Sequence, residues 1–446
     1  MKVTLRYTLV ALAAFLWCLT PTLAQDHGQD TQEHTDHSGH DHDHGDHDGH
    51  DHGDGKHSKV LHEGCAHDED GAYDPVSTVM HHIADANEFH VWYGVHIPLP
   101  CILYAPEHGL STFLSSKFDH GHQAVDAYVL NHGRVNRVAD SSFPKGEVHI
   151  ECIVHKEETI VNGDKAEKKD VYYALYEGKE YKLDKPSTLD GGLLGGGITS
   201  FYDFSITKNV FTMILASILL ILLFLAVARG YKRNEGKAPS GIQSFMEPFF
   251  VFIRDEVTKP MIGEKYERFQ PFILTIFFFI LFCNLFGLIP FFPGSANVTG
   301  NIGVTLVLAV FAFLVTNLNG NGHYWEHIFW MPGIPAWVKV VLTPVEVLGL
   351  FIKPFSLMIR LFANISAGHI IILSLIGMIF LFGNNGESVP GAVAGGVVGG
   401  AFSAFMNLIE LLVAFLQAFI FAILTAAYIG AAVEEGHHDE AHEGAH

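Results

Sequence analysis

Long apolar runs dominate the second half of the chain, and they restrict its fold more than any other feature. The runs cover residues 206–228, 269–292, 302–318 and 338–433, and the last is interrupted near GNNGES. A helix needs about 20 apolar residues to cross a bilayer, so the last run is long enough for two helices. The sequence therefore predicts an all-α polytopic membrane protein with about five membrane helices, of which the last two are long.

Residues 1–24 have the layout of a cleavable signal peptide. Lys2 and Arg6 give a basic start, an apolar stretch follows, and a small-residue ending precedes Gln25. The alternative is a first membrane anchor, for which the apolar core is short. The next residues are therefore predicted to begin outside the cytosol.

Residues 25–70 form a tract of twelve His and fourteen acidic residues against two Lys. With almost nothing apolar to bury, this tract is predicted to be disordered. Imidazole and carboxylate groups bind zinc, copper and nickel, so weak metal binding is one hypothesis, with the candidates His40, His42, His44, His47, His50 and His52. A solvated tail that only buffers protons is the alternative, because no spacing specifies one closed site.

Residues 71–205 are rich in β-branched and aromatic residues with partial alternation, separated by Gly, Asp and Pro. This pattern predicts a small β-rich extracytoplasmic domain. One disulfide can form among Cys65, Cys101 and Cys152, and the odd count leaves the pair open. We expect a membrane domain over 206–435 and a cytosolic tail over 436–446.

The loop between the first and second apolar runs is basic, whereas the loop after the second run has no basic residue. Its positive charges are Arg229, Lys232, Arg233, Lys237, Arg254, Lys259, Lys265 and Arg268. The positive-inside rule puts this loop in the cytosol. A secreted N-terminal region followed by five crossings then gives a cytosolic C-terminus, as expected for a protein of the bacterial inner membrane with a periplasmic N-terminal region.

A few ionisable residues interrupt the final apolar run. Glu346, Lys353 and Arg360 are seven residues apart, which brings them to one helix face if the helix continues through Pro354. Asn364 continues this face. Each charge at the centre of a membrane helix costs about 2.5–3.5 kcal/mol, so each needs a partner, water or a function. Lys353, beside Pro354, is expected simply to extend to the membrane interface.

The last helix carries a second polar stripe. Ser403, Glu410 and Gln417 repeat the seven-residue spacing, with Asn407 one turn before Glu410 and Tyr428 returning to nearly the same angle. Two stripes favour a path for something polar. The alternative is a pair of hydrogen-bonded seams that join helices, and it applies to Asn407 and Ser403 more than to the ionisable residues.

The ionisable groups divide into two chemical classes. Glu346, His369 and Glu410 can gain and lose protons. Arg360 stays charged at any physiological pH, so it cannot be a link in a proton wire. We expect it to be a fixed charge that attracts carboxylates and interrupts a proton path.

The segments KPFSLMIRLFANISAGH and LLVAFLQAFIFAILTAAYIGAAVEE resemble the two signature helices of subunit a of the F-type ATP synthase. The resemblance covers residues 201–435. It implies a non-catalytic stator subunit whose last two helices are tilted against a rotating ring of small carboxylate-bearing subunits, in a complex with a peripheral-stalk subunit. Two offset half-channels would carry protons to and from the ring. The resemblance implies no cofactor and no nucleic-acid partner.

The resemblance also implies residue roles. Arg360 matches the essential arginine that faces the ring and separates the half-channels. Asn364 and Gln417 match polar positions near it. Asn407, one turn before Glu410 on the polar stripe, is also predicted to line a half-channel. His369 and Glu410 match a pair in the extracytoplasmic inlet, and Glu346 matches a carboxylate of the cytosolic exit.

The chain departs from the family pattern in two places. Many bacterial members have the acid and the imidazole of the inlet pair exchanged relative to His369 and Glu410, and Ala363 stands where Gly is frequent. The signal peptide, the His-rich tract and the β-rich domain are outside the common pattern.

A metal-ion transporter with a metal-collecting His-rich segment is the main alternative. It requires several ligands that converge from the membrane helices, whereas the membrane region offers one clear His and a fixed Arg that repels cations. A periplasmic metal chaperone would not explain five spans with polar stripes.

Overall fold

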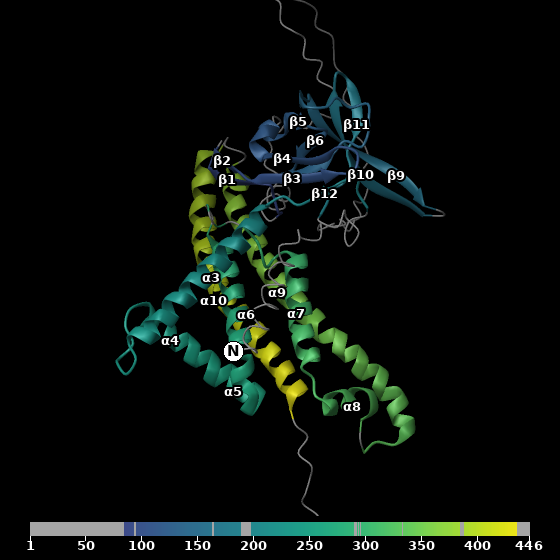
Figure 1. Cartoon of the computed structure of the whole chain (residues 1–446). Helices are drawn as coiled ribbons and strands as arrows, with labels where there is room; N and C mark the ends of the chain where they lie inside the picture. Colours follow the sequence, from purple (N-terminus) through teal and green to yellow (C-terminus); the bar gives the residue numbers. More distant parts are fainter. Residues whose placement is uncertain are drawn as a thin grey trace, which may run out of the picture.

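The computed structural model describes residues 84–434 except 93–94, 163–164, 189–197, 290–291, 293, 295, 332 and 384–387. The predicted signal peptide, the His-rich tract with its six candidate ligands, Cys65 and the C-terminal tail lie outside the described residues. Within the described part, strands come first along the chain and long helices follow, as the sequence predicts. Figure 1 shows the strands gathered at one end of the helical bundle.

The described strands form four small antiparallel sheets, ordered β1-β2, β12-β3-β4, β7-β6-β5-β8 and β11-β10-β9. A short helical segment, η1 (Ser115–Gly121), lies between β4 and β5. The strands are β1 (Glu88–Trp92), β2 (Val95–Pro98), β3 (Pro100–Ala105), β4 (Gly109–Leu114), β5 (Gln123–Val125), β6 (Tyr128–Asn131), β7 (Arg134–Arg137), β8 (Glu147–His149), β9 (Cys152–Asn162), β10 (Lys165–Tyr176), β11 (Lys179–Lys182) and β12 (Tyr202–Asp203).

Alternation along the strands directs one side of a strand into an apolar cluster, as β3 shows. In β3, Cys101, Leu103 and Ala105 are buried, whereas Tyr104 between them is exposed. The buried set packs with aromatic side chains from η1 and from the segment before β12, among them Phe118 and Phe201. The β-rich region therefore has its own apolar clusters, separate from the core of the helices.

The two described cysteines of the β-rich region, Cys101 and Cys152, are in different states. Cys152 forms a disulfide whose partner lies outside the described residues. Cys101 is a free, buried thiol, and burial raises its pKa to about 12. Cys101 is therefore excluded from the disulfide that the sequence left open, and its thiol is unreactive.

The helical part contains the long apolar helices that the sequence predicts. They are α3 (Lys208–Arg233), α4 (Ile242–Phe252), the π-helical turn η2 (Ile253–Thr258), α5 (Lys259–Ile262), η3 (Gly263–Lys265), α6 (Tyr266–Leu288), α7 (Ile302–Leu318), α8 (Gly322–Trp330), α9 (Ala336–Phe382) and α10 (Val389–Val433). Among the residues that the structure describes, four helical stretches are long and apolar enough to cross a membrane. A fifth span is obtained if α7 and α8, which meet at 104°, form one broken span, which agrees with the predicted number.

The two longest helices, α9 and α10, form an antiparallel hairpin that runs through the bundle (Figure 1). Helix α9 continues through both Pro344 and Pro354. Glu346 and Arg360 therefore lie on one uninterrupted helix, as the seven-residue repeat requires for a common face. Small residues let the two backbones approach closely. A Cβ on Gly399 would lie 2.6 Å from the Leu375 carbonyl oxygen of α9.

A buried ionic contact joins the β-rich region to the start of α3. Asp85 Oδ1 accepts hydrogen bonds from the Asn209 amide at 3.2 Å and the Ala86 amide at 3.0 Å, and Asp85 Oδ2 lies 3.2 Å from Arg134 Nη1. The Lys208 amide donates to the Ala86 carbonyl at 2.8 Å. Because a carboxylate at a helix N-terminus also meets the positive end of the helix dipole, Asp85 ties strand β7 to α3.

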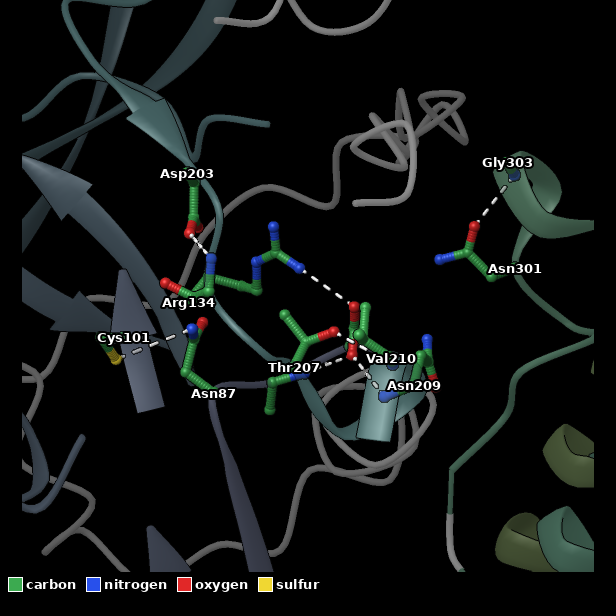
Figure 2. A network of polar contacts seen from close by, with 12 residues as sticks. Asn87, Cys101, Arg134, Asp203, Thr207, Asn209, Val210, Asn301 and Gly303 are labelled. Carbon is green, nitrogen blue, oxygen red and sulfur yellow. Dashed lines mark hydrogen bonds and ion pairs between the residues drawn. The ribbon is translucent and has the colours of Figure 1, made fainter. Parts of the chain in front are cut away.

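The same junction is closed by further polar contacts. Figure 2 shows Arg134, Thr207 and Asn209 converging at the start of α3, with Asn87 and Cys101 on the side of the sheets. The Thr207 side chain caps α3 by accepting from the Val210 amide. The side chains of Arg134 and Asp85 are only 14% and 5% exposed, so this ion pair is shielded from water.

We expect Asp85→Ala to loosen this junction. Removing the carboxylate takes the 3.2 Å partner away from the buried Arg134 guanidinium, which should lower the free energy of unfolding of the β-rich region by about 3–5 kcal/mol. Thermal melting of the full chain and protease cleavage between β12 and α3 would measure the effect. Glu147→Ala, which removes the exposed Lys117–Glu147 pair, is the control. Equal melting shifts for the two variants would contradict the assignment.

Candidate functional site

The structure brings two ionisable residues together inside the bundle, His369 of α9 and Glu410 of α10. His369 Nε2 lies 3.9 Å from Glu410 Oε1, and the two side chains are 18% and 3% exposed. Within the described residues, neither carboxylate oxygen of Glu410 has a hydrogen-bond partner. A buried carboxyl group with unused acceptor atoms is suited to exchange a proton with water or with a neighbouring imidazole.

Glycines determine how closely the two helices approach at this pair. A Cβ on Gly368 would lie 2.7 Å from Glu410 Oε1 and 2.9 Å from its Cδ. A Cβ on Gly287 of α6 would lie 3.5 Å from His369 Nε2. The backbones of α9 and α6 therefore lie beside the pair, and a side chain at Gly368 would displace Glu410, whereas a Cβ at Gly287 would only contact His369.

A buried polar network from α6 and the α6–α7 loop lies next to the pair. Asn284 Nδ2 donates to the Ala414 carbonyl at 3.0 Å, and Thr299 Oγ1 donates to Asn284 Oδ1 at 2.6 Å. Ser366 Oγ donates to the Gly300 carbonyl at 3.3 Å. The sequence did not identify these residues as part of the site, although an Asn inside the apolar run of α6 was a signal that could have pointed to one of them.

Arg360 lies nine residues before His369 on α9, which is about 14 Å along the helix axis. Its side chain is half-buried, and no hydrogen bond or salt bridge of its guanidinium occurs in the described part of the chain. The approach of Gly368 to Glu410 fixes the antiparallel register, so Gln417, seven residues after Glu410, comes to the level of Arg360. Gln417 is 5% exposed, whereas Asn364 faces outward.

A second group of polar residues lies on the other side of Arg360 along α9. Glu346 is fourteen residues before Arg360, about 21 Å away along the axis. It lines a recess with Lys339 and His327. Lys353 lines a neighbouring recess between α7, α8, α9 and α10, and its Nζ lies 5.5 Å from the centre of the Tyr428 ring. Lys353 is exposed and faces Tyr428 of α10, and its extension to the membrane interface stays a prediction.

The polar stripe of α10 has three buried members. Ser403, Glu410 and Gln417 are 7%, 3% and 5% exposed and share the face toward the other helices, as their spacing predicts. Asn407 does not join them, because it is exposed and its side chain donates to the Ser403 carbonyl at 3.3 Å. Three residues along a helix are a rotation of about 300°, which leaves Asn407 about 60° from the stripe.

The arrangement separates two ionisable sites by a fixed charge. The His369–Glu410 pair lies at the level of the α6–α7 loop, and Glu346 lies near α8 at the opposite side of Arg360. Carboxyl and imidazole groups can take up and release protons, and a guanidinium cannot. Arg360 therefore cannot relay a proton from one of these sites to the other along α9.

Comparisons with known proteins divide the chain at the same place as the fold. Residues 210–430 match a family model described as ATP synthase A chain, and residues 78–192 match one described as a domain of unknown function. The β-rich region is thus a recurrent domain, and the helices are the part with a named family.

Curated relatives agree with the family match. ATP synthase subunit a of Chloroherpeton thalassium is 47% identical over 187 residues, which are 41% of this chain and 55% of the relative. ATP synthase subunit a 2 of Chlorobaculum tepidum is 45% identical over 40% of this chain and 51% of its own length. The chain therefore spans about half the length of these relatives.

A longer alignment reaches further into both sequences. ATP synthase subunit a of Anaeromyxobacter dehalogenans is 36% identical over 288 residues, which are 58% of this chain and 73% of the relative. Identity of this level over most of a relative cannot arise from apolar composition alone. The chain is a multi-pass membrane protein that belongs to the family of ATP synthase subunit a.

Proposed function

We propose that the chain is the proton-conducting stator subunit of an F-type ATP synthase and has no catalytic site of its own. The observation that carries the proposal is the position of Arg360 on α9 between two ionisable sites, the His369–Glu410 pair and Glu346. Each site would belong to one half-channel. A proton can then cross only on a carboxylate that moves past Arg360 on another subunit.

The proposed partner is a ring of small membrane subunits that each carry a carboxylate. A half-buried Arg360 without an internal ion pair in the described residues is available to such a carboxylate. The exposed surface of α9 around Arg360 is apolar and includes Phe355 and Ile359. Such a surface is suited to pack against an apolar transmembrane helix of another subunit. Gln417 and Asn364 would hydrogen-bond near the meeting point. A peripheral-stalk subunit is a further proposed partner from the family.

We also propose an orientation in a bacterial inner membrane. The basic loop between α3 and α6 would be cytosolic and the β-rich region periplasmic. The Cys152 disulfide supports this side for the β-rich region, because disulfides persist in oxidising compartments. The His369–Glu410 pair, near the α6–α7 loop and the β-rich region, would then belong to the inlet, and Glu346 to the cytosolic exit.

A metal-ion transporter is less well supported. Such a protein needs several His, Asp or Glu ligands that converge in the membrane region. Among the described residues, the group of three such side chains with suitable spacing lies in the β-rich region, outside the helices.

Arg360→Ala should reduce proton-driven ATP synthesis and ATP-driven proton pumping to background in membranes that contain the assembled complex. ATP hydrolysis by the detached catalytic sector should be unchanged, because the substitution affects only the membrane path. Arg254→Ala, which removes an exposed arginine paired with Asp255, is the control and should keep coupling. Normal synthesis in the Arg360 variant would rule out the proposed role.

Exchange of the inlet pair tests whether His369 and Glu410 act together. His369→Glu alone places two carboxylates about 4 Å apart, and Glu410→His alone places two imidazoles there, so each should lower proton pumping strongly. The double exchange restores one acid and one imidazole and should recover much of the activity. If the double variant is as inactive as the singles, the two residues do not form a functional pair.

Gly368→Ala should disturb the same pair without removing a charge. The added Cβ would meet Glu410 Oε1 at 2.7 Å, so the carboxylate must move, and a displacement of about 1 Å can cost up to 100-fold in rate. We expect proton pumping to fall roughly tenfold. Gly349→Ala on the same helix is the matched control, because nothing lies within 4 Å of its added Cβ. Similar pumping by both variants would disagree with the close contact.

A further inference from the structure

Three metal-binding side chains converge in the β-rich region, away from the membrane helices. Glu88 of β1, His96 of β2 and His120 of η1 place one donor atom each within 4.8 Å of the others. Glu88 is buried, His96 is half-buried and His120 is exposed, so the cluster opens to solvent on one side. Nothing in the proton path uses these residues.

The register of the β1–β2 hairpin places the first two donors on one face. Glu88 pairs with Pro98 and His90 with His96, so Glu88 and His96 are diagonal neighbours on the same side of the hairpin. Glu88 Oε1 lies 3.6 Å from His96 Nδ1. Two ligands about 2.0–2.1 Å from a tetrahedral zinc ion lie roughly 3.4 Å apart, so this pair already has nearly the required separation.

The third donor is held next to the hairpin by backbone contacts. The amide of Ser115, at the start of η1, donates to the Leu99 carbonyl at 3.0 Å, and the Leu99 amide donates to Ser115 Oγ at 3.1 Å. Phe118 anchors η1 in the core. These contacts bring the His120 ring to 4.3 Å from the His96 ring, centre to centre.

The backbone at the third donor is in an unusual conformation. Asp119 and His120 both have left-handed dihedral angles, with φ of 43° and 54°. Such angles in residues other than Gly cost of order 1–3 kcal/mol each and cluster at ligand sites. The turn is held by the His122 amide, which donates to the Asp119 carbonyl at 3.0 Å. The strained turn thus directs an imidazole toward His96 and Glu88.

We propose that Glu88, His96 and His120 bind one divalent transition-metal ion, with zinc as the best match. Two imidazoles and one carboxylate suit zinc, copper or nickel and leave a fourth position open, whereas calcium and magnesium prefer oxygen ligands alone. The Cys101 thiol is not one of the converging donor atoms, which belong to Glu88, His96 and His120. The His-rich tract, which precedes this region along the chain, would raise the local supply of the metal.

The metal would stiffen the contact between the β-rich region and the membrane helices. Phe89 follows Glu88 and therefore points to the opposite side of β1. Its ring packs edge-on against Phe211 of α3 at 5.5 Å and Phe292 of the α6–α7 loop at 5.4 Å. A metal that joins β1, β2 and η1 on one side would hold Phe89 in place on the other.

The test is zinc titration of the purified full chain in detergent, in competition with a chromophoric chelator. The wild-type chain should show one tight equivalent above the weaker sites of the His-rich tract. His96→Ala combined with His120→Ala should weaken that equivalent by roughly 100-fold or more and leave the tract sites unchanged. His149→Ala, which removes an exposed His from β8 of the same region, is the matched control and should keep the tight equivalent.

A second measurement separates metal binding from misfolding. Zinc should slow hydrogen exchange of the β1 amides in the wild-type chain and in the His149 control. It should not do so in His120→Ala, whose substituted side chain is exposed and should leave the fold intact. Equal stoichiometry, affinity and exchange protection in the wild-type chain and both site variants would overturn the proposal. Glu88 and His96 would then be only an ion pair.

Discussion

The cost of an ionisable group in a bilayer is the constraint on which the membrane part of this protein depends. A charged side chain at the centre of a membrane helix costs about 2.5–3.5 kcal/mol, and a bare carboxylate needs a neighbour or water. The bundle meets this cost by holding α9 and α10 so close that Glu410 is enclosed between them beside His369. Small residues on α10 and Gly368 on α9 make this approach feasible, and Asn284 of α6 secures the backbone of α10 at Ala414.

The continuity of α9 gives these local features a common axis. Because the helix continues through Pro344 and Pro354, Glu346, Arg360 and His369 keep fixed positions along one rod. The ionisable sites are then at defined distances from the fixed charge, and α10 adds Glu410 and Gln417 at matching levels. The β-rich region is joined to the same end of the bundle as the His369–Glu410 pair by Asp85 and by the contact of Phe89 with α3 and the α6–α7 loop.

Helical periodicity predicted the parts of the site that lie on single helices. The seven-residue spacing correctly placed Ser403, Glu410 and Gln417 on one buried face, because rotation per residue is a local property. Asn407 lies three residues before Glu410 and not seven, so it is rotated away from this face and is exposed. The contacts of Gly368 with Glu410 and of Asp85 with α3 were beyond the sequence, because they depend on which residues of distant segments meet. The contact between Glu88 and His96 is of the same kind, because it depends on the register of the β1–β2 hairpin, and His120 reaches the two residues only through the position of η1.

In the proposed function, Arg360 divides the polar path along α9 into two parts that open to opposite sides of the membrane. Ser356 and Ser366 flank Arg360 on this helix and are both half-buried. The most direct measurement is the labelling of Ser356→Cys and Ser366→Cys by a membrane-impermeant thiol reagent added to either side of sealed vesicles, with the labelled site identified by mass spectrometry. If Arg360 separates two half-channels, Ser356→Cys should react from the cytosolic side and Ser366→Cys from the periplasmic side. Reaction of both from the same side would contradict it.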